Sequence, residues 1–117
     1  EQYWYRRDTV DSDWANSGDA SEVYEHITEA MVSRADNMFT VAQAVATPTA
    51  ESIRDGILGG PNNLWSFSQP ITENVVEWLR GWVAASVPAN IIMTDFYDRH
   101  DVVAETLRAN RDALGAN

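Results

Sequence analysis

The sequence predicts an α/β fold in which helices cover a parallel sheet. Two short runs rich in apolar and β-branched residues, 38–46 and 90–96, have the composition of buried strands. Segments with apolar residues at helical spacing precede and follow these runs. Strands that alternate with helices along a chain form parallel sheets covered by those helices, so this order favours that fold class.

The amino-terminal part of the chain predicts the end of a strand, a turn and a helix. Residues 1–7 (EQYWYRR) are aromatic and extended in character, and residues 12–18 are polar and turn-like. Asp19 stands three residues before Glu22, which is the spacing of a capping box at a helix start. The helix is expected over residues 20–35, with apolar residues at helical intervals at Val23, Ile27, Ala30 and Met31.

The middle of the chain predicts a strand, a short helix and a loop. The strand at 38–46 stops at Thr47-Pro48-Thr49. Thr49 is suited to cap a short helix that ends near Gly59-Gly60. Residues 59–70 (GGPNNLWSFSQP) are expected to form a loop.

The carboxyl-terminal part predicts a helix, a strand and a last helix. The first helix follows Thr72 and ends before Pro88, with an apolar stripe of Val75, Val76, Leu79, Trp82 and Val83. Residues 90–96 (NIIMTDF) form the second strand. Asp98 or Asp101 is suited to cap a last helix that carries Val103, Leu107 and Leu114 on one face.

Composition limits the classes of protein that the chain can represent. With 117 residues, 44% of them apolar, the chain can bury a core and fits a single domain. Its net charge is −10 and all eight basic residues are Arg, scattered along the chain, which disfavours a nucleic-acid partner. The absence of Cys excludes disulfides and thiolate metal sites. The apolar runs are far shorter than the roughly 20 residues of a membrane span.

Asp95 is the main candidate for a functional residue. It stands at the carboxyl end of the strand at 90–96, and parallel α/β folds build their sites at that end of the strands. An Asp in this position also serves as a cap for a turn or for the next helix. Because Asp98 and Asp101 are better placed for capping, a role at the site is the preferred interpretation of Asp95.

Four segments resemble the bacterial phosphatidylinositol-specific phospholipase C family. TDFYDRHDVVAETLRANRDAL (94–114) is similar to the last strand and helix of that family, and ITENVVEWLRGWV (71–83) to the helix before them. TVAQAVATPT (40–49) resembles the penultimate strand, and Glu1-Gln2-Tyr3 an acid-x-Tyr element at the end of an earlier strand. The resemblance runs through the chain in the right order.

The resemblance implies a (β/α) barrel of the TIM type, a fold of about 250 residues. At 117 residues the chain is then expected to be the carboxyl-terminal portion of a single such domain, with about three βα units. The amino-terminal half of the same protein, which in the family carries two catalytic His and a phosphate-binding Arg, is the expected partner.

The resemblance also implies roles for individual residues. Asp95 matches the carboxylate that orients the first catalytic His. In the family this His takes the proton of the inositol 2-hydroxyl, which attacks phosphorus to give a cyclic phosphate, and the second His protonates the leaving diacylglycerol. Glu1 matches a residue that binds inositol hydroxyls, and Tyr3 an aromatic that stacks on the sugar ring or packs on its neighbours.

Other residues have more than one interpretation. Arg6 is placed to reach a phosphate, or to pair with nearby Asp side chains. His26 is expected on a solvated helix face, and His100 lacks the further ligands that a metal site needs. Trp65 and Phe67 are expected to pack on adjacent helices or to enter a lipid interface. We therefore expect no metal or cofactor, with a Ca²⁺-dependent variant, ligated by Glu1 or Asp95, as the alternative.

The expected function is cleavage of phosphoric diesters in phosphatidylinositol-type lipids, by a secreted protein acting on head groups at a membrane surface. The chain alone is expected to be inactive. One alternative is an inactive barrel that binds a sugar or lipid head group, with Tyr3, Trp4 and Tyr5 as the stacking surface. A second alternative is a structural α/β domain that associates with another copy of itself.

Overall fold

The computed structural model describes residues 9–35, 37–60 and 62–115. Their centre is a three-stranded parallel sheet with the strand order β1–β2–β3. The strands are β1 (Val10–Asp11), β2 (Phe39–Ala44) and β3 (Ile91–Thr94). The predicted α/β class with a parallel sheet is confirmed, and so are the strands expected near 38–46 and 90–96.

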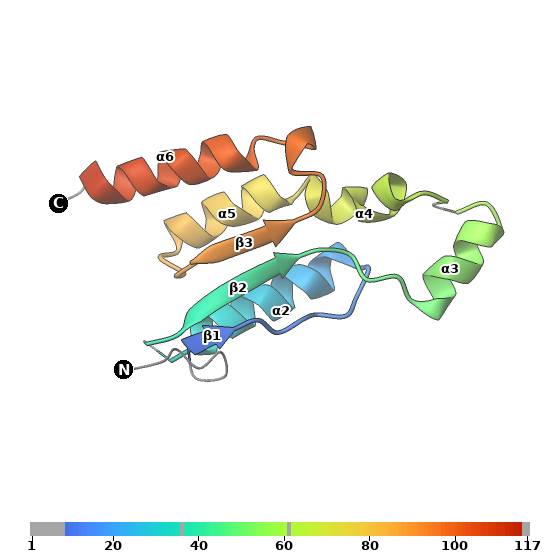
Figure 1. Cartoon of the computed structure of the whole chain (residues 1–117), viewed down its shortest axis with the longest axis horizontal. Coiled ribbons are helices and arrows are strands. Elements are labelled where there is room, and N and C mark those ends of the chain that lie inside the picture. Colours follow the sequence, from blue (N-terminus) through green and yellow to red (C-terminus); the bar gives the residue numbers. More distant parts are fainter. Residues whose placement is uncertain (1–8, 36, 61, 116–117) are drawn as a thin grey trace, which may run out of the picture.

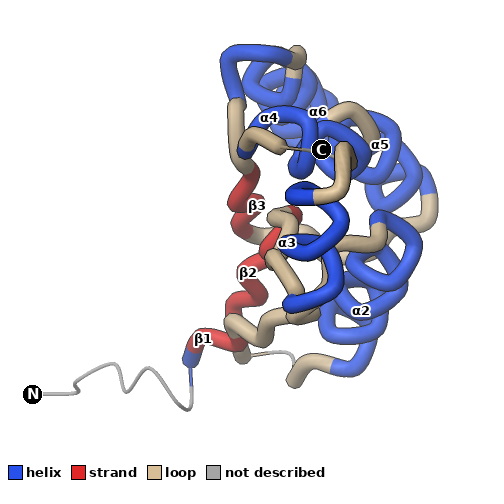
Figure 2. The backbone as a smooth tube through the Cα atoms, turned by 90° about the vertical axis from the view of Figure 1, so that its right-hand side faces the viewer, coloured by secondary structure: helices blue, strands red, loops and turns tan. Residues whose placement is uncertain are grey.

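Five α-helices are described around this sheet: α2 (Ala20–Ser33), α3 (Ala50–Ile57), α4 (Leu64–Thr72), α5 (Val75–Ala84) and α6 (Val102–Gly115). A short 3₁₀ helix, η1 (Tyr97–Arg99), precedes α6. Helices α2, α5 and α6 lie on one side of the sheet, and among the described residues no helix covers the other side (Figure 2). Strands β2 and β3 point toward the end of the molecule where α3 and α4 lie (Figure 1). No described helix is both long and apolar enough to cross a bilayer.

Asp19 caps α2, as the sequence predicts. Its Oδ1 accepts hydrogen bonds from the hydroxyl of Ser21 and from the backbone N–H groups of Ser21 and Glu22. These bonds, above all the one from the Ser21 side chain, lower the pKa of Asp19. The Asp19 N–H donates to Ser17 Oγ at 3.0 Å, and this hydroxyl donates to Glu22 Oε2 at 2.6 Å. In the predicted capping box, Ser17 therefore bridges the Asp19 N–H and the Glu22 carboxylate, which do not bond to each other directly.

The stretch 59–70 was expected to be a loop, and this expectation is wrong because it contains most of α4. Asn63 Oδ1 accepts from the N–H of Ser66 at 2.8 Å and so caps the helix. Pro70 lies inside α4 and removes only the N–H that would bond four residues back. Because Thr72 is the last residue of α4, the helix expected to follow it begins later, at Val75.

The first strand of the sheet also differs from the prediction. Residues 1–7, expected to end a strand, lie outside the described residues. The described first strand is β1, whose Val10 and Asp11 pair with Phe39 and Thr40 of β2. These positions carry no alternating apolar pattern, so pairing with β2, rather than local propensity, explains the strand.

The core lies between the sheet and the helices. Val23, Ile27 and Met31 of α2 and Val75 and Trp82 of α5 are buried there. The indole N–H of Trp82 donates to Thr28 Oγ1 at 2.9 Å, so α5 and α2 share a satisfied polar contact inside the apolar layer. On β2 the residues that face these helices are small: Ala42 and Ala44 have no exposed surface.

The two faces of the sheet differ in burial. Thr40, Ala42 and Ala44 are buried, whereas the alternating positions Phe39, Val41 and Gln43 are partly exposed. Parallel pairing joins Val41 to Ile91 and Gln43 to Met93, which continues the second set on β3. An open face therefore exists among the described residues, made of Phe39, Val41, Gln43, Ile91 and Met93. This places Gln43 on the face away from the helices, where Nε2 donates to Ser12 O at 3.0 Å.

The apolar stripe predicted for α6 is exposed among the described residues. Val103, Leu107 and Leu114 are 55%, 57% and 77% exposed, while Val102 and Glu105 are buried. Glu105 forms ion pairs with Arg80 of α5 and with Arg108, and Val102 lies in the same core cluster as Val75 and Trp82 of α5. Asp101 directly precedes α6, as one of the two expected caps, and its backbone oxygen accepts from the N–H of Glu105 at 2.9 Å, while the Val102 N–H donates to His100 Nδ1 at 3.3 Å.

Candidate functional site

Asp95 directly follows β3, at the edge of the sheet to which the parallel strands point. It is partly buried. The hydroxyl of Ser68, a buried residue of α4, lies 3.4 Å from Asp95 Oδ2 and is oriented to donate to it. Helix α4 thus reaches the end of β3 and restrains one carboxylate oxygen. The predicted position of Asp95 at the carboxyl end of its strand is confirmed.

The backbone turns sharply after Asp95. Phe96 has φ 49° and ψ 43°, the left-handed conformation that costs a residue other than Gly about 1–2 kcal/mol. Its ring meets that of Trp65 edge to face, with centroids 5.2 Å apart. This contact helps to offset the strain. The turn leads the chain from the end of β3 into η1.

A basic group stands next to this aromatic pair. Arg99 Cζ lies 5.4 Å from the centroid of the Trp65 ring, a cation–π distance. The Arg99 side chain is 61% exposed and its Nε is 4.0 Å from Asp98 Oδ2. Trp65, Phe96 and Arg99 therefore form a cluster, called the rim cluster below, beside Asp95. It offers an exposed guanidinium to an anion such as a phosphate.

Both histidines have structural contacts away from Asp95. His26 Nε2 lies 3.4 Å from Asp13 Oδ2, which links α2 to the segment after β1. His100 Nδ1 accepts the first N–H of α6. Among the described residues no group of three or more His, Cys, Asp or Glu side chains is placed to hold a metal ion.

Of the four site residues predicted from the sequence, the structure describes only Asp95. Glu1, Tyr3 and Arg6 lie outside the described residues, and their predicted roles stay predictions. Of the two aromatics considered for a lipid interface, Trp65 contacts Phe96 and Phe67 packs against the core. Sequence reasoning missed Ser68 and the rim cluster. The only local signal was Asn63, whose spacing to Ser66 suits a helix cap.

The carboxyl edge of the sheet also carries exposed apolar side chains. Helix α3 has no buried residue, and Ile53 and Ile57 are 57% and 81% exposed. A hollow of 390 Å³ between α3 and α4 is lined by both, together with Leu64 and Phe67. This edge thus combines a carboxylate, a guanidinium and an apolar surface.

Comparison with known proteins points to phospholipase C-like domains. The chain is 24% identical over 102 residues to "PI-PLC X domain-containing protein 3" of Homo sapiens and of Bos taurus, which is 83% of this chain and 30% of each relative. It is 26% identical over 103 residues to "PI-PLC X domain-containing protein 2" of Mus musculus, 86% of this chain and 29% of that protein. The chain thus spans less than a third of the length of these relatives. No protein-family model and no solved structure matches it.

The similarity is distant and supports the phospholipase C X type at the level of family. The three-stranded parallel sheet with its helices is compatible with a TIM-type fold.

Proposed function

We propose that this chain is part of a phospholipase C-like phosphodiesterase domain that acts on phosphatidylinositol-type lipids. The observation that carries the proposal is the similarity to PI-PLC X domain proteins over most of the chain. The position of Asp95 supports it, because this partly buried carboxylate directly follows the carboxyl end of a parallel strand, where α/β folds place their sites.

The proposed domain is a (β/α) barrel of the TIM type, to which residues 1–117 contribute about three βα units. In such barrels the helices form an outer ring and the inner faces of the strands form the interior. The described sheet agrees with one sector of that arrangement, since its helices lie on one side (Figure 2). The remaining units, including the catalytic histidines, would come from the amino-terminal part of the same protein.

In this proposal Asp95 orients a catalytic His. Ser68 Oγ lies 3.4 Å from Oδ2, and Oδ1 is proposed to accept the imidazole N–H and to stabilise the imidazolium that forms during the reaction. The His removes the proton of the inositol 2-hydroxyl, whose oxygen bonds to phosphorus as the bond from phosphorus to the glycerol oxygen breaks. A second His gives the glycerol oxygen a proton. Asp95 is therefore proposed as a positioning residue that acts through the His.

The head group is proposed to bind along the carboxyl edge of the sheet. Glu1 would bind inositol hydroxyls, Tyr3 would stack on the ring, and Arg6 would contact the phosphate. The rim cluster supplies a further exposed guanidinium, Arg99, at the same edge as Asp95. The exposed Ile53 and Ile57 of α3 supply apolar surface toward the acyl chains of a lipid layer.

The proposed mechanism uses no metal. A Ca²⁺-dependent variant, with Glu1 or Asp95 as ligand, predicts complete loss of activity in EGTA, whereas the His-based mechanism predicts that activity persists. Secretion of the protein is likewise a proposal. Its test is the recovery of the protein from the medium rather than from the cells of its source organism.

The test of function uses the complete translated polypeptide that contains residues 1–117. Phosphatidylinositol in mixed micelles should yield cyclic inositol phosphate, and phosphatidylcholine should yield no product. Asp95→Asn should lower kcat by on the order of 10³- to 10⁴-fold. The control Asp98→Asn removes an exposed carboxylate three residues away and should retain activity. Equal activity in the two variants, or no hydrolysis by the unaltered protein, would refute the proposal.

A second candidate function is head-group binding without catalysis. It is favoured by the exposed guanidinium of Arg99 at the same edge as Asp95, which is suited to bind an anion without taking part in proton transfer. Binding of inositol phosphates to the complete polypeptide without turnover, weakened by Arg99→Gln, would support this candidate over the enzyme.

A further inference from the structure

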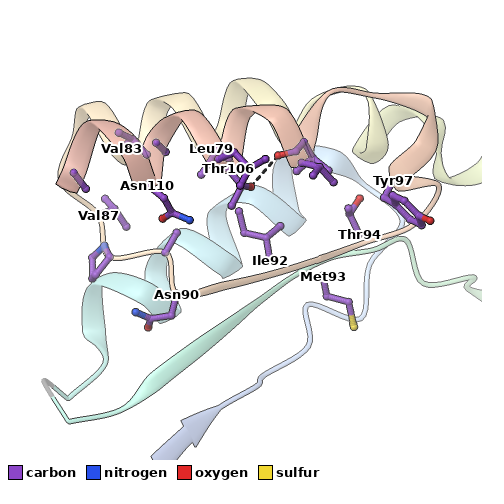
Figure 3. A pocket seen from close by; sticks show the side chains of 17 residues that line it. Leu79, Val83, Val87, Asn90, Ile92, Met93, Thr94, Tyr97, Thr106 and Asn110 are labelled. Atoms are coloured by element: carbon purple, nitrogen blue, oxygen red, sulfur yellow. Dashed lines mark hydrogen bonds between the residues drawn. The ribbon is translucent and has the colours of Figure 1, made fainter. Parts of the chain in front are cut away.

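Among the described residues of the open face of the sheet, Gln43 has the one polar side chain. The other residues of this face are apolar: Phe39, Val41, Ile91 and Met93. Figure 3 shows Met93 pointing away from the helices, whereas Ile92 and Thr94 point toward them. Because β2 and β3 are parallel and Gln43 pairs with Met93, the Gln43 side chain lies on the side away from the helices as well.

The segment after β1 holds the amide of Gln43 in one orientation. Nε2 donates to Ser12 O at 3.0 Å, to Ser12 Oγ at 3.1 Å and to Asp13 O at 3.3 Å. Two of these three partners are backbone carbonyl oxygens, which only accept hydrogen bonds. A rotation that exchanged Nε2 with Oε1 would place an oxygen against both carbonyls. The network therefore determines which end of the amide is the nitrogen.

The same network leaves the oxygen of this amide available to a ligand. No described residue donates a hydrogen bond to Gln43 Oε1, and this oxygen is not buried. An amide oxygen accepts hydrogen bonds from hydroxyl and N–H groups, whereas a fully ionised phosphate or carboxylate has no hydrogen to donate to it. Because Nε2 is already anchored, Oε1 is a preorganised acceptor that loses little conformational freedom when a ligand binds.

Gln43 lies close to the end of the sheet that carries Asp95. It is the next-to-last residue of β2, and its partner Met93 precedes Asp95 by two residues. At about 3.3 Å per residue, Asp95 is about 7 Å further along the strand direction. A six-membered ring with its hydroxyl substituents spans such a separation, so one ligand can reach both Asp95 and Gln43.

We propose that Gln43 Oε1 accepts a hydrogen bond from one ring hydroxyl of the inositol head group, which makes Gln43 a substrate-binding residue. This inference rests on the proposed function, which supplies the polyhydroxylated ring and makes the open face of the sheet the interior of the barrel. In that interior an unpaired amide oxygen is unfavourable, and the ligand hydroxyl satisfies it. Loss of such a bond should weaken binding of the ring about tenfold.

Calorimetric binding of inositol 1-phosphate to the complete translated polypeptide tests this role. Gln43→Met keeps the length of the side chain and removes the amide, and it should weaken binding about tenfold. With phosphatidylinositol micelles it should raise KM and leave kcat almost unchanged, in contrast to Asp95→Asn. The matched control Gln69→Met makes the same exchange on α4, where the amide donates to Glu73 of the same chain segment, and should leave binding unchanged.

Monodeoxy analogues of inositol 1-phosphate distinguish a contact with the ligand from a role in holding the segment after β1. One analogue should bind the unaltered protein about tenfold more weakly than inositol 1-phosphate, and Gln43→Met should bind these two compounds equally. If Gln43→Met weakens the parent compound and every analogue by the same factor, the side chain acts on the fold alone and the proposal is overturned. Equal binding of inositol 1-phosphate by Gln43→Met and by the unaltered protein would overturn it as well.

Failure of the proposed function gives a different result. Binding that depends on Gln43 without hydrolysis of phosphatidylinositol would support the contact and refute the phosphodiesterase. Hydrolysis together with binding that does not depend on Gln43 would refute the contact alone. Absence of both binding and hydrolysis would refute both proposals.

Discussion

Arg80 of α5 donates a hydrogen bond to Glu105 of α6, with Nη2 and Oε2 3.3 Å apart. Arg108, one turn along α6, donates to the other oxygen of the same carboxylate. Glu105 is buried, so two guanidinium groups compensate one carboxylate at the contact between the last two helices. This relationship gives the first prediction.

The free energy of unfolding should fall in acid because Glu105 becomes protonated. The hydrogen bond from Arg108, with that from Arg80, lowers the pKa of Glu105 against the opposing effect of burial. The charged form therefore stabilises the folded state above the carboxyl pKa of the unfolded chain, about 4.3, and this contribution is lost as the pH falls through the lower folded pKa. Glu105→Gln should lower Tm at pH 7, and the difference should shrink toward pH 3. Glu77→Gln, at an exposed partner of Arg80, is the control, and a difference independent of pH would contradict the assignment.

Removing the hydroxyl of Ser68 should lower kcat of the complete polypeptide by roughly ten- to a hundredfold, because misplacement of a positioned group by a fraction of an ångström reduces turnover. KM should change little, since Ser68 is buried away from solvent. The variant for this test is Ser68→Ala, measured with phosphatidylinositol micelles. Ser66→Ala serves as control, as its hydroxyl bonds only within the first turn of α4. A parallel loss in both variants would indicate damage to the helix instead of to Asp95.

Trp82→Phe should destabilise the fold by about 2–4 kcal/mol. The smaller ring leaves a cavity in the core, and Thr28 loses the indole N–H that it accepts at 2.9 Å. Urea unfolding followed by circular dichroism measures the change. Trp14→Phe, at a residue that is 52% exposed, should change the free energy of unfolding by less than about 0.5 kcal/mol. Similar losses in the two variants would disagree with the described core.

Thr49→Ala should weaken α3 without weakening the rest of the molecule. Thr49 Oγ1 accepts from the N–H of Ser52 at 3.1 Å, and Ser52 Oγ accepts from the N–H of Thr49 at 2.9 Å, which completes a capping box. Its loss should destabilise the helix by about 1 kcal/mol. Hydrogen exchange should accelerate over 50–57 while the global Tm stays constant, because α3 buries no residue. A matching fall in Tm would show that α3 unfolds with the core.

Local signals explain which parts of the fold the sequence predicts. Helix α2 has both a cap at Asp19 and an apolar period, and β2 and β3 are bounded by Pro and polar residues, so these elements are found with small errors at their ends. Helix α4 was missed because its cap residue, Asn63, and the internal Pro70 are also typical of loops. Only the tertiary position of Ser68 decides whether this segment forms a helix or a loop.

The packing of α6 and the surroundings of Asp95 could not be predicted from the sequence, and for the same physical reason. Periodicity groups Val103 with Leu107 on one face, but it contains no information on which neighbour covers that face. The strand pattern likewise identifies Asp95 by its position alone. The approach of Ser68 and Arg99 to this strand end depends on the path of α4 and η1, which separate segments of the chain determine together.

The fully buried alanines of β2 set how closely the helical layer approaches the sheet. Ala42 and Ala44 extend only a methyl group toward α2 and α5, so these helices pack close to the backbone of β2. A larger side chain there would lift the helices away from the sheet instead of being absorbed by a neighbour. Because α4 leads directly into α5, such a displacement would also carry Ser68 away from Asp95. The small size of Ala42 and Ala44 on the middle strand thus sets the distance between Ser68 and Asp95, at the end of the next strand.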